Sequence, residues 1–136
     1  MNRIVLHLPL LAIIVAAMVV GIVAGLARLG IEMPTLAMER VGLHGPILAA
    51  GVFGTLIALE RAVAMRTVMA RDWTWADAAP ILTGAGTILL LVNGGTVPAL
   101  ALLAAGAAVL VVINLEMLRR HPTLDVATMA IGAGFL

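Results

Sequence analysis

Four long apolar segments constrain the fold of this chain more than any other feature of its sequence. Each has about 20 residues with few charges, which is the length that an α-helix needs to cross about 30 Å of bilayer hydrocarbon. The segments are residues 4–27, 43–63, 74–93 and 98–118. They predict an all-α fold, a polytopic transmembrane helix bundle.

The composition agrees with a membrane environment. Hydrophobic residues make up 63% of the 136 residues and charged residues 11%, whereas soluble domains have about 25% charged residues. The chain has no Lys, Ser or Gln with which to cover a water-exposed surface. A net charge of +1 provides no basic field for nucleic acid, and the absence of Cys excludes disulfides and thiolate metal sites. The lipid bilayer is therefore the expected surrounding.

Residues with turn and capping chemistry mark the ends of these segments. Thr74 and Asp77 have the spacing of a capping box at the start of the third segment. Asn93-Gly94-Gly95 predicts a short hairpin before the fourth segment, and Pro98 suits the first turn of a helix. Residues 28–42 connect the first two segments and are predicted to lie on the membrane surface.

The last apolar segment, residues 124–136, is shorter than the others. As a helix it would cover about 20 Å, too little to span the membrane alone. Lipid does not tolerate unpaired carbonyl groups at membrane depth, so the segment is either re-entrant or belongs to a longer protein. We favour the interpretation that the chain is a fragment.

The positions of the arginines predict the orientation. Six of the eight lie on the side shared by the N-terminus and the loops at 61–75 and 119–124. By the positive-inside rule this side is cytoplasmic, as expected for a multi-pass protein of the bacterial inner membrane. The first segment is longer than the about 7–15 apolar residues of a signal peptide, so we expect a retained helix.

Small residues form ladders on the predicted helices, and such ladders let helices approach closely in lipid. They comprise Ala17, Gly21 and Gly25 in the first helix, Gly51, Gly54, Ala58 and Ala62 in the second, and Ala101, Ala104, Ala105 and Ala108 in the fourth. The ladders predict packing, either within one bundle or against the helices of another protein.

Three histidines are the candidate cofactor ligands. His7 and His121 are predicted on the same side of the membrane, where imidazoles from two helices could hold haem b. His44 opens the second helix at the opposite side and shares a stripe with Gly51 and Thr55 that faces a neighbour or a cavity. We rank His44 first among the three. No cluster of side chains predicts a metal site.

Other polar residues lie near the ends of the predicted helices. Glu60 and Arg61 are predicted to form a structural ion pair. Glu116 and Arg120 have the i,i+4 spacing of a helical ion pair. Asn114 lies deeper and is predicted to form a hydrogen-bonded bridge between two helices.

One stretch of the sequence resembles the signature of a protein family. The stretch comprises His44-Gly45-Pro46, Gly51, Phe53-Gly54-Thr55, Ile57 and Leu59-Glu60-Arg61-Ala62-Val63-Ala64. It resembles an uncharacterised family of bacterial multi-spanning membrane proteins, to which residues 75–80 and 121–134 are also similar. More distantly, a His-led helix with small residues is similar to NnrS-type haem-copper membrane proteins, and this resemblance implies that His44 is a metal or haem ligand.

The residue types argue against catalysis. The chain has neither Ser nor Cys for a nucleophilic triad, and nucleotide-binding and zinc motifs are absent from the sequence. We therefore expect a protein that is not an enzyme. The leading expectation is an accessory or structural subunit that packs against partner helices in a larger membrane complex or a homo-oligomer. The alternative is a haem- or metal-binding membrane protein that uses His44, or His7 with His121.

Overall fold

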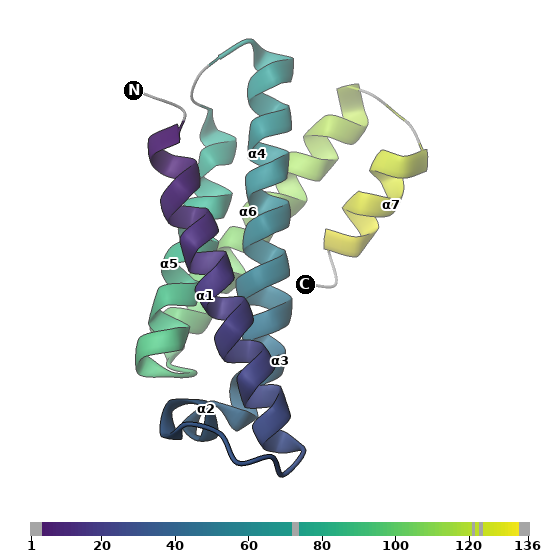
Figure 1. Ribbon diagram of the computed structural model, residues 1–136. Coiled ribbons are helices and arrows are strands. Elements are labelled where there is room, and N and C mark those ends of the chain that lie inside the picture. Colours follow the sequence, from purple (N-terminus) through teal and green to yellow (C-terminus); the bar gives the residue numbers. More distant parts are fainter. Residues whose placement is uncertain (1–3, 72–73, 121, 123, 134–136) are drawn as a thin grey trace.

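The computed structural model describes residues 4–71, 74–120, 122 and 124–133, and the elements it contains over these residues are all helical (Figure 1). Within these residues, four helices are long and apolar enough to cross a membrane: His7–Arg28, Val41–Met69, Trp75–Asn93 and Val97–Arg120. The predicted all-α bundle with four spans is confirmed, and the chain is a multi-pass membrane protein.

The elements follow one another with short connections. In order they are α1 (Ile4–Arg28), α2 (Thr35–Glu39), η1 (Val41–Leu43), α3 (His44–Pro46), η2 (Ile47–Gly54), α4 (Thr55–Met69), η3 (Trp75–Asp77), α5 (Ala78–Asn93), α6 (Val97–Arg120) and α7 (Leu124–Ala133). Elements η1 to α4 form one continuous span, which continues six residues beyond the predicted end at residue 63. The extension carries Arg66, which has a partner outside its own helix.

The element η2 is a π-helix, which winds more widely than an α-helix and often occurs at functional sites. Pro46, which has no backbone N–H, precedes it directly. The turn places the carbonyl oxygen of Gly51 at 3.4 Å from the hydroxyl of Thr87 in α5. Apolar periodicity did not distinguish this turn from an α-helix, so it is a finding of the structure alone.

The helices α5 and α6 form a closely packed antiparallel hairpin. A Cβ atom on Gly86 would lie 2.9 Å from the backbone nitrogen of Leu103, and one on Gly106 would lie 3.0 Å from that of Thr83. Cβ atoms in proteins almost never come this close to another atom, so the backbones of α5 and α6 leave no room for a side chain at either position. Glycine is therefore required at both positions for this approach.

The remaining long elements pack around this hairpin (Figure 1). α1 crosses the η2–α4 span and α5, while α7 lies beside α6 on the side of α4 away from α1. Among the side chains that the structure describes, the buried core forms two clusters. One comprises Ile14, Ala17, Ile47, Val52, Leu90, Ala99 and Leu103, and the other comprises Ala58, Ala62, Met65, Ala76, Ala79 and Ile113.

Candidate functional site

A buried ion pair joins α4 to the start of α5. The carboxylate of Asp77 is fully buried and accepts a hydrogen bond from Arg66 Nε at 2.7 Å. Its other oxygen accepts from the backbone N–H of Thr74 at 2.7 Å, so the predicted capping box forms. The pair thereby connects the two ends of the loop between α4 and η3 and fixes their separation.

The same arginine reaches α1. Arg66 Nη1 lies 3.3 Å from Nε2 of His7, and because a guanidinium only donates, this ring nitrogen accepts. His7 thus belongs to a polar network that connects three elements. His121 lies outside the described residues, so the predicted pairing of His7 with His121 stays a prediction.

His44 lies at the opposite end of the bundle. Its Nδ1 donates a hydrogen bond to the carbonyl oxygen of Val41 at 2.9 Å, within the first turn of the span. The ring lies against α1, where a Cβ on Gly25 would be 3.8 Å from His44 Cδ2. The neighbour that His44 faces is therefore α1. Over the described residues, no group of three or more His, Cys, Asp or Glu side chains is placed to hold a metal ion.

The small residues of α1 and of the η2–α4 span lie at contacts inside this chain, except Gly54, where an added Cβ would approach only Ala49 of its own span. Gly25 is half-buried, and the other ladder members are buried, namely Ala17, Gly21, Gly51, Gly54, Ala58 and Ala62. A Cβ on Gly21 would lie 3.1 Å from the side chain of Ile47, and one on Gly51 would lie 3.2 Å from that of Thr87. These ladders hold the bundle together.

The small residues of α6 are placed differently, because they are exposed. They are Ala101, Ala104, Ala105 and Ala108. The exposed face of α1 instead carries large side chains, namely Leu8, Leu11, Val15, Met18, Val19 and Ile22. Large side chains suit contact with lipid chains, whereas a row of alanines leaves the helix backbone accessible to another helix.

An apolar groove adjoins this row of alanines, between the α3–η2 segment and α6. Its volume is about 190 Å³, and its lining comprises Pro46, Ala50, Gly54, Thr83, Leu100, Leu103, Ala104, Ala107 and Leu110. Four of the nine are Gly or Ala, and they come from both walls. The hydroxyl of Thr83 donates to the carbonyl of Ala79 at 3.0 Å, so it is already bonded within α5. We call this feature the η2–α6 groove.

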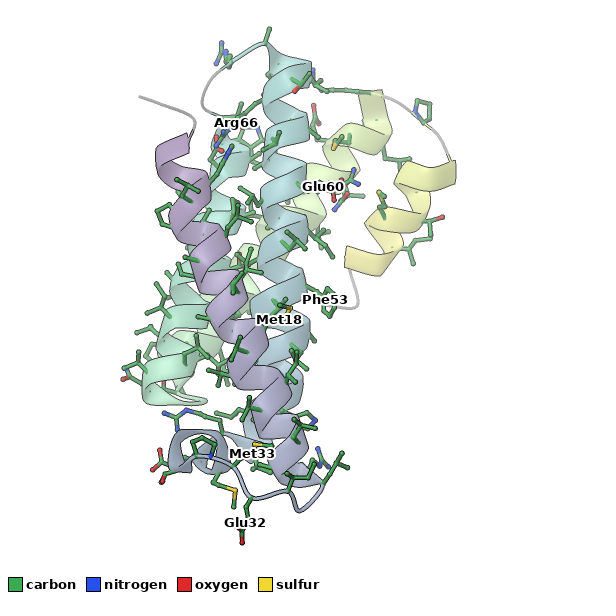
Figure 2. All side chains as sticks on the ribbon, in the orientation of Figure 1. Met18, Glu32, Met33, Phe53, Glu60 and Arg66 are labelled. Atoms are coloured by element: carbon green, nitrogen blue, oxygen red, sulfur yellow. The ribbon has the colours of Figure 1, made fainter. Side chains whose placement is uncertain are left out.

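The pair Glu60–Arg61 lies on α4, where the two side chains point in different directions. The side chain of Glu60 is 65% exposed, lies between α4 and α7 (Figure 2), and contacts Arg61 at 3.3 Å. The side chain of Arg61 is 8% exposed and donates to the sulfur atoms of Met129 in α7 at 2.6 Å and of Met117 in α6 at 3.9 Å. The cation is thus turned inward and the carboxylate outward.

The polar residues of α6 interact within their own helix. Arg120 donates to Glu116 at 2.8 Å across one exposed turn. Asn114 Nδ2 donates to the carbonyl of Leu110 at 3.0 Å, and its Oδ1 is buried with no partner in the described part of the chain. Within the same residues, Asn114 therefore does not form the predicted bridge to a second helix.

Arg40, which no local sequence pattern marks as functional, caps the C-terminal end of α5. Its Nη2 donates to the carbonyl of Val92 at 3.0 Å and its Nε to that of Leu91 at 3.4 Å. The last carbonyls of a helix have no partner within it, so a cation there stabilises them. Arg40 is separated from Leu91 by 51 positions in the sequence and from Val92 by 52, so only the tertiary arrangement brings them together.

The contribution of the Arg40 cap to stability can be measured by removing its charge. Arg40→Met is expected to lower the free energy of unfolding by about 1.5–3 kcal/mol, the usual contribution of a hydrogen bond from a charged donor. Arg28→Met, at an exposed arginine near the same end, is the control and should change stability by less than about 0.5 kcal/mol. Thermal unfolding in detergent measures both, and equal melting temperatures would show that the cap contributes nothing.

Comparison with known proteins gives one family. The sequence model of a family described as a domain of unknown function (DUF8744) matches residues 7–136. No curated protein and no solved structure shows a significant match. The resemblance to the NnrS-type proteins therefore stays a prediction.

Proposed function

The chain belongs to the DUF8744 family, and from its geometry we propose that it is a non-enzymatic subunit of the bacterial inner membrane that docks a membrane-spanning helix of a partner protein. The observation that carries this proposal is the η2–α6 groove, with small residues on both walls. The complex that results would be a larger membrane assembly in which this chain has an accessory or structural role.

The small residues that line both walls of the groove favour a helix over a lipid chain as its occupant. Lipid chains and apolar side chains are alike in polarity, so helices associate in membranes through close packing rather than through the hydrophobic effect. Ala50 and Gly54 on one wall and Ala104 and Ala107 on the other allow the backbone of an incoming helix to approach both elements. A lipid-facing surface has no such requirement, as the large side chains on α1 illustrate.

The chemistry of the groove supports a binding role without catalysis. Its lining is aliphatic apart from Thr83, whose hydroxyl is bonded to the backbone of α5. The haem alternative gains no support from the described histidines, because His7 accepts from Arg66 and His44 lies at the other end of the bundle, against α1. Packing is the function that this surface supports best.

A bulky substitution in the groove tests the proposal. Ala104 is exposed, so Ala104→Phe should leave the fold intact while filling the groove. In native membranes solubilised gently and separated on a blue native gel, the tagged wild-type chain is expected in a discrete larger complex. We expect Ala104→Phe to reduce that complex by about 10-fold, the effect of losing about 1.4 kcal/mol of binding free energy.

The matched control is Val15→Phe, which adds bulk to the exposed face of α1. It should leave the complex unchanged, and both variants should melt within a few degrees of the wild type. Mass spectrometry of the complex distinguishes a different subunit from a second copy of this chain. Equal amounts of complex in the wild type and in Ala104→Phe would contradict the proposal.

A further inference from the structure

Between Phe53 and Val63, the outer face of the η2–α4 span is apolar except for one carboxylate. Phe53, Leu56 and Val63 are exposed on this face, and Glu60 lies among them at helical spacing (Figure 2). Figure 2 places the Glu60 side chain in the space between α4 and α7. An ionisable side chain on a membrane-spanning face is costly, so its position requires an explanation.

Glu60 lies well inside the ends of its span. It precedes Arg66 by six residues, which corresponds to about 9 Å along the helix. Arg66 marks the polar end of the bundle, where it pairs with Asp77. A Glu side chain is shorter than that of Arg and reaches the headgroups less easily, so Glu60 depends on a partner at its own depth.

Arg61 satisfies the hydrogen-bonding capacity of the Glu60 carboxylate only in part. Among the described residues, Arg61 is its one hydrogen-bond partner, through Oε1 at 3.3 Å. Arg61 is turned inward to two methionine sulfur atoms, so it leaves the outer side of the carboxylate uncovered. At the same time the cation of Arg61 balances the negative charge of Glu60.

We propose that the partner helix carries a neutral hydrogen-bond donor, a hydroxyl or an amide, opposite Glu60; this inference rests on the proposed function. A second cation would leave a net positive charge within the hydrocarbon, whereas a neutral donor completes the hydrogen bonding of a pair that is already balanced. Gly54 of the η2–α6 groove lies six residues before Glu60 on the same span, about 9 Å away along the axis. Six residues also place Gly54 and Glu60 about 120° apart around the span, so a docked helix that contacts both positions crosses the span obliquely.

A double substitution tests this inference while avoiding an unpaired buried arginine. Glu60→Leu combined with Arg61→Met removes both charges and replaces them with side chains of similar size. We expect this variant to melt close to the wild type but to lose the partner about 10-fold on the native gel, as expected for a hydrogen bond within a membrane. Glu60→Gln combined with Arg61→Met also removes both charges but keeps an acceptor oxygen at position 60, and should retain the complex within about 3-fold.

Glu32→Leu is the control, because Glu32 is exposed at the opposite end of the bundle (Figure 2) and should not affect the complex. If Ala104→Phe releases the partner but the double variant retains it, the inference about Glu60 is wrong and the proposed function stands. If neither variant releases the partner, both are wrong. If the double variant alone releases it, Glu60 contacts the partner and the groove does not.

Discussion

Asp77→Ala is expected to lower the free energy of unfolding by about 3–5 kcal/mol, the cost of breaking a buried ion pair by removing one partner. The side chain of Arg66 is only 11% exposed, so it cannot recover full hydration when its carboxylate is lost. The same substitution removes the acceptor of the Thr74 backbone N–H at the start of η3. Titration with SDS or thermal unfolding in detergent would measure the loss.

An exposed ion pair provides the control for Asp77. Glu116→Ala removes the acceptor of Arg120 on the surface of α6, and exposed pairs of this kind contribute about 0–1 kcal/mol. Combining Asp77→Ala with Arg66→Met should recover part of the lost stability, because no buried guanidinium that has lost the carboxylate of Asp77 then remains. Equal destabilisation by Asp77→Ala and Glu116→Ala would show that the buried pair does not hold the loop.

Gly106→Ala is also expected to destabilise the bundle, although it adds a single methyl group. The new Cβ would lie 3.0 Å from the backbone nitrogen of Thr83 and 3.1 Å from the carbonyl oxygen of Ala79. Backbone atoms cannot rotate away as a side chain can, so α5 and α6 must separate. Overpacking of this kind costs about 1–3 kcal/mol, which the same unfolding assay would detect.

Gly132→Ala is the matched control for the α5–α6 contact. Gly132 is helical, and a Cβ there would meet nothing within 4 Å. Because alanine favours a helix over glycine by about 1 kcal/mol, this variant should melt at or slightly above the wild-type temperature. A similar loss of stability in both variants would mean that the backbone contact at Gly106 is not what limits the approach of the helices.

The spans could be predicted from the sequence because lipid imposes a simple length and polarity requirement on each helix. The capping box of Thr74 and Asp77 was also predictable, since it depends on local spacing alone. The ion pair of Asp77 with Arg66 was not, because the two residues lie on either side of a loop. The π-helix at η2 was missed for another reason, since its apolar residues fit an α-helix equally well.

The candidate docking surface likewise has features that can be predicted from the sequence and features that depend on tertiary packing. Small residues on three helices are evident from the sequence, but their spacing does not separate those used inside the bundle from those left exposed. Packing makes this distinction: Ala58 and Ala62 are buried, while Ala104 and Ala105 are exposed. The opposite directions of Glu60 and Arg61 likewise depend on where α6 and α7 lie.

Site-specific photocrosslinking in native membranes tests the central claim, that a partner helix occupies the η2–α6 groove. Benzoylphenylalanine would replace Leu100, which lines the groove, or Leu11, which is similarly exposed on α1. The account predicts one discrete protein adduct from Leu100, with a crosslinked peptide from a membrane-spanning segment, and only lipid adducts from Leu11. Lipid adducts alone at both positions would contradict it.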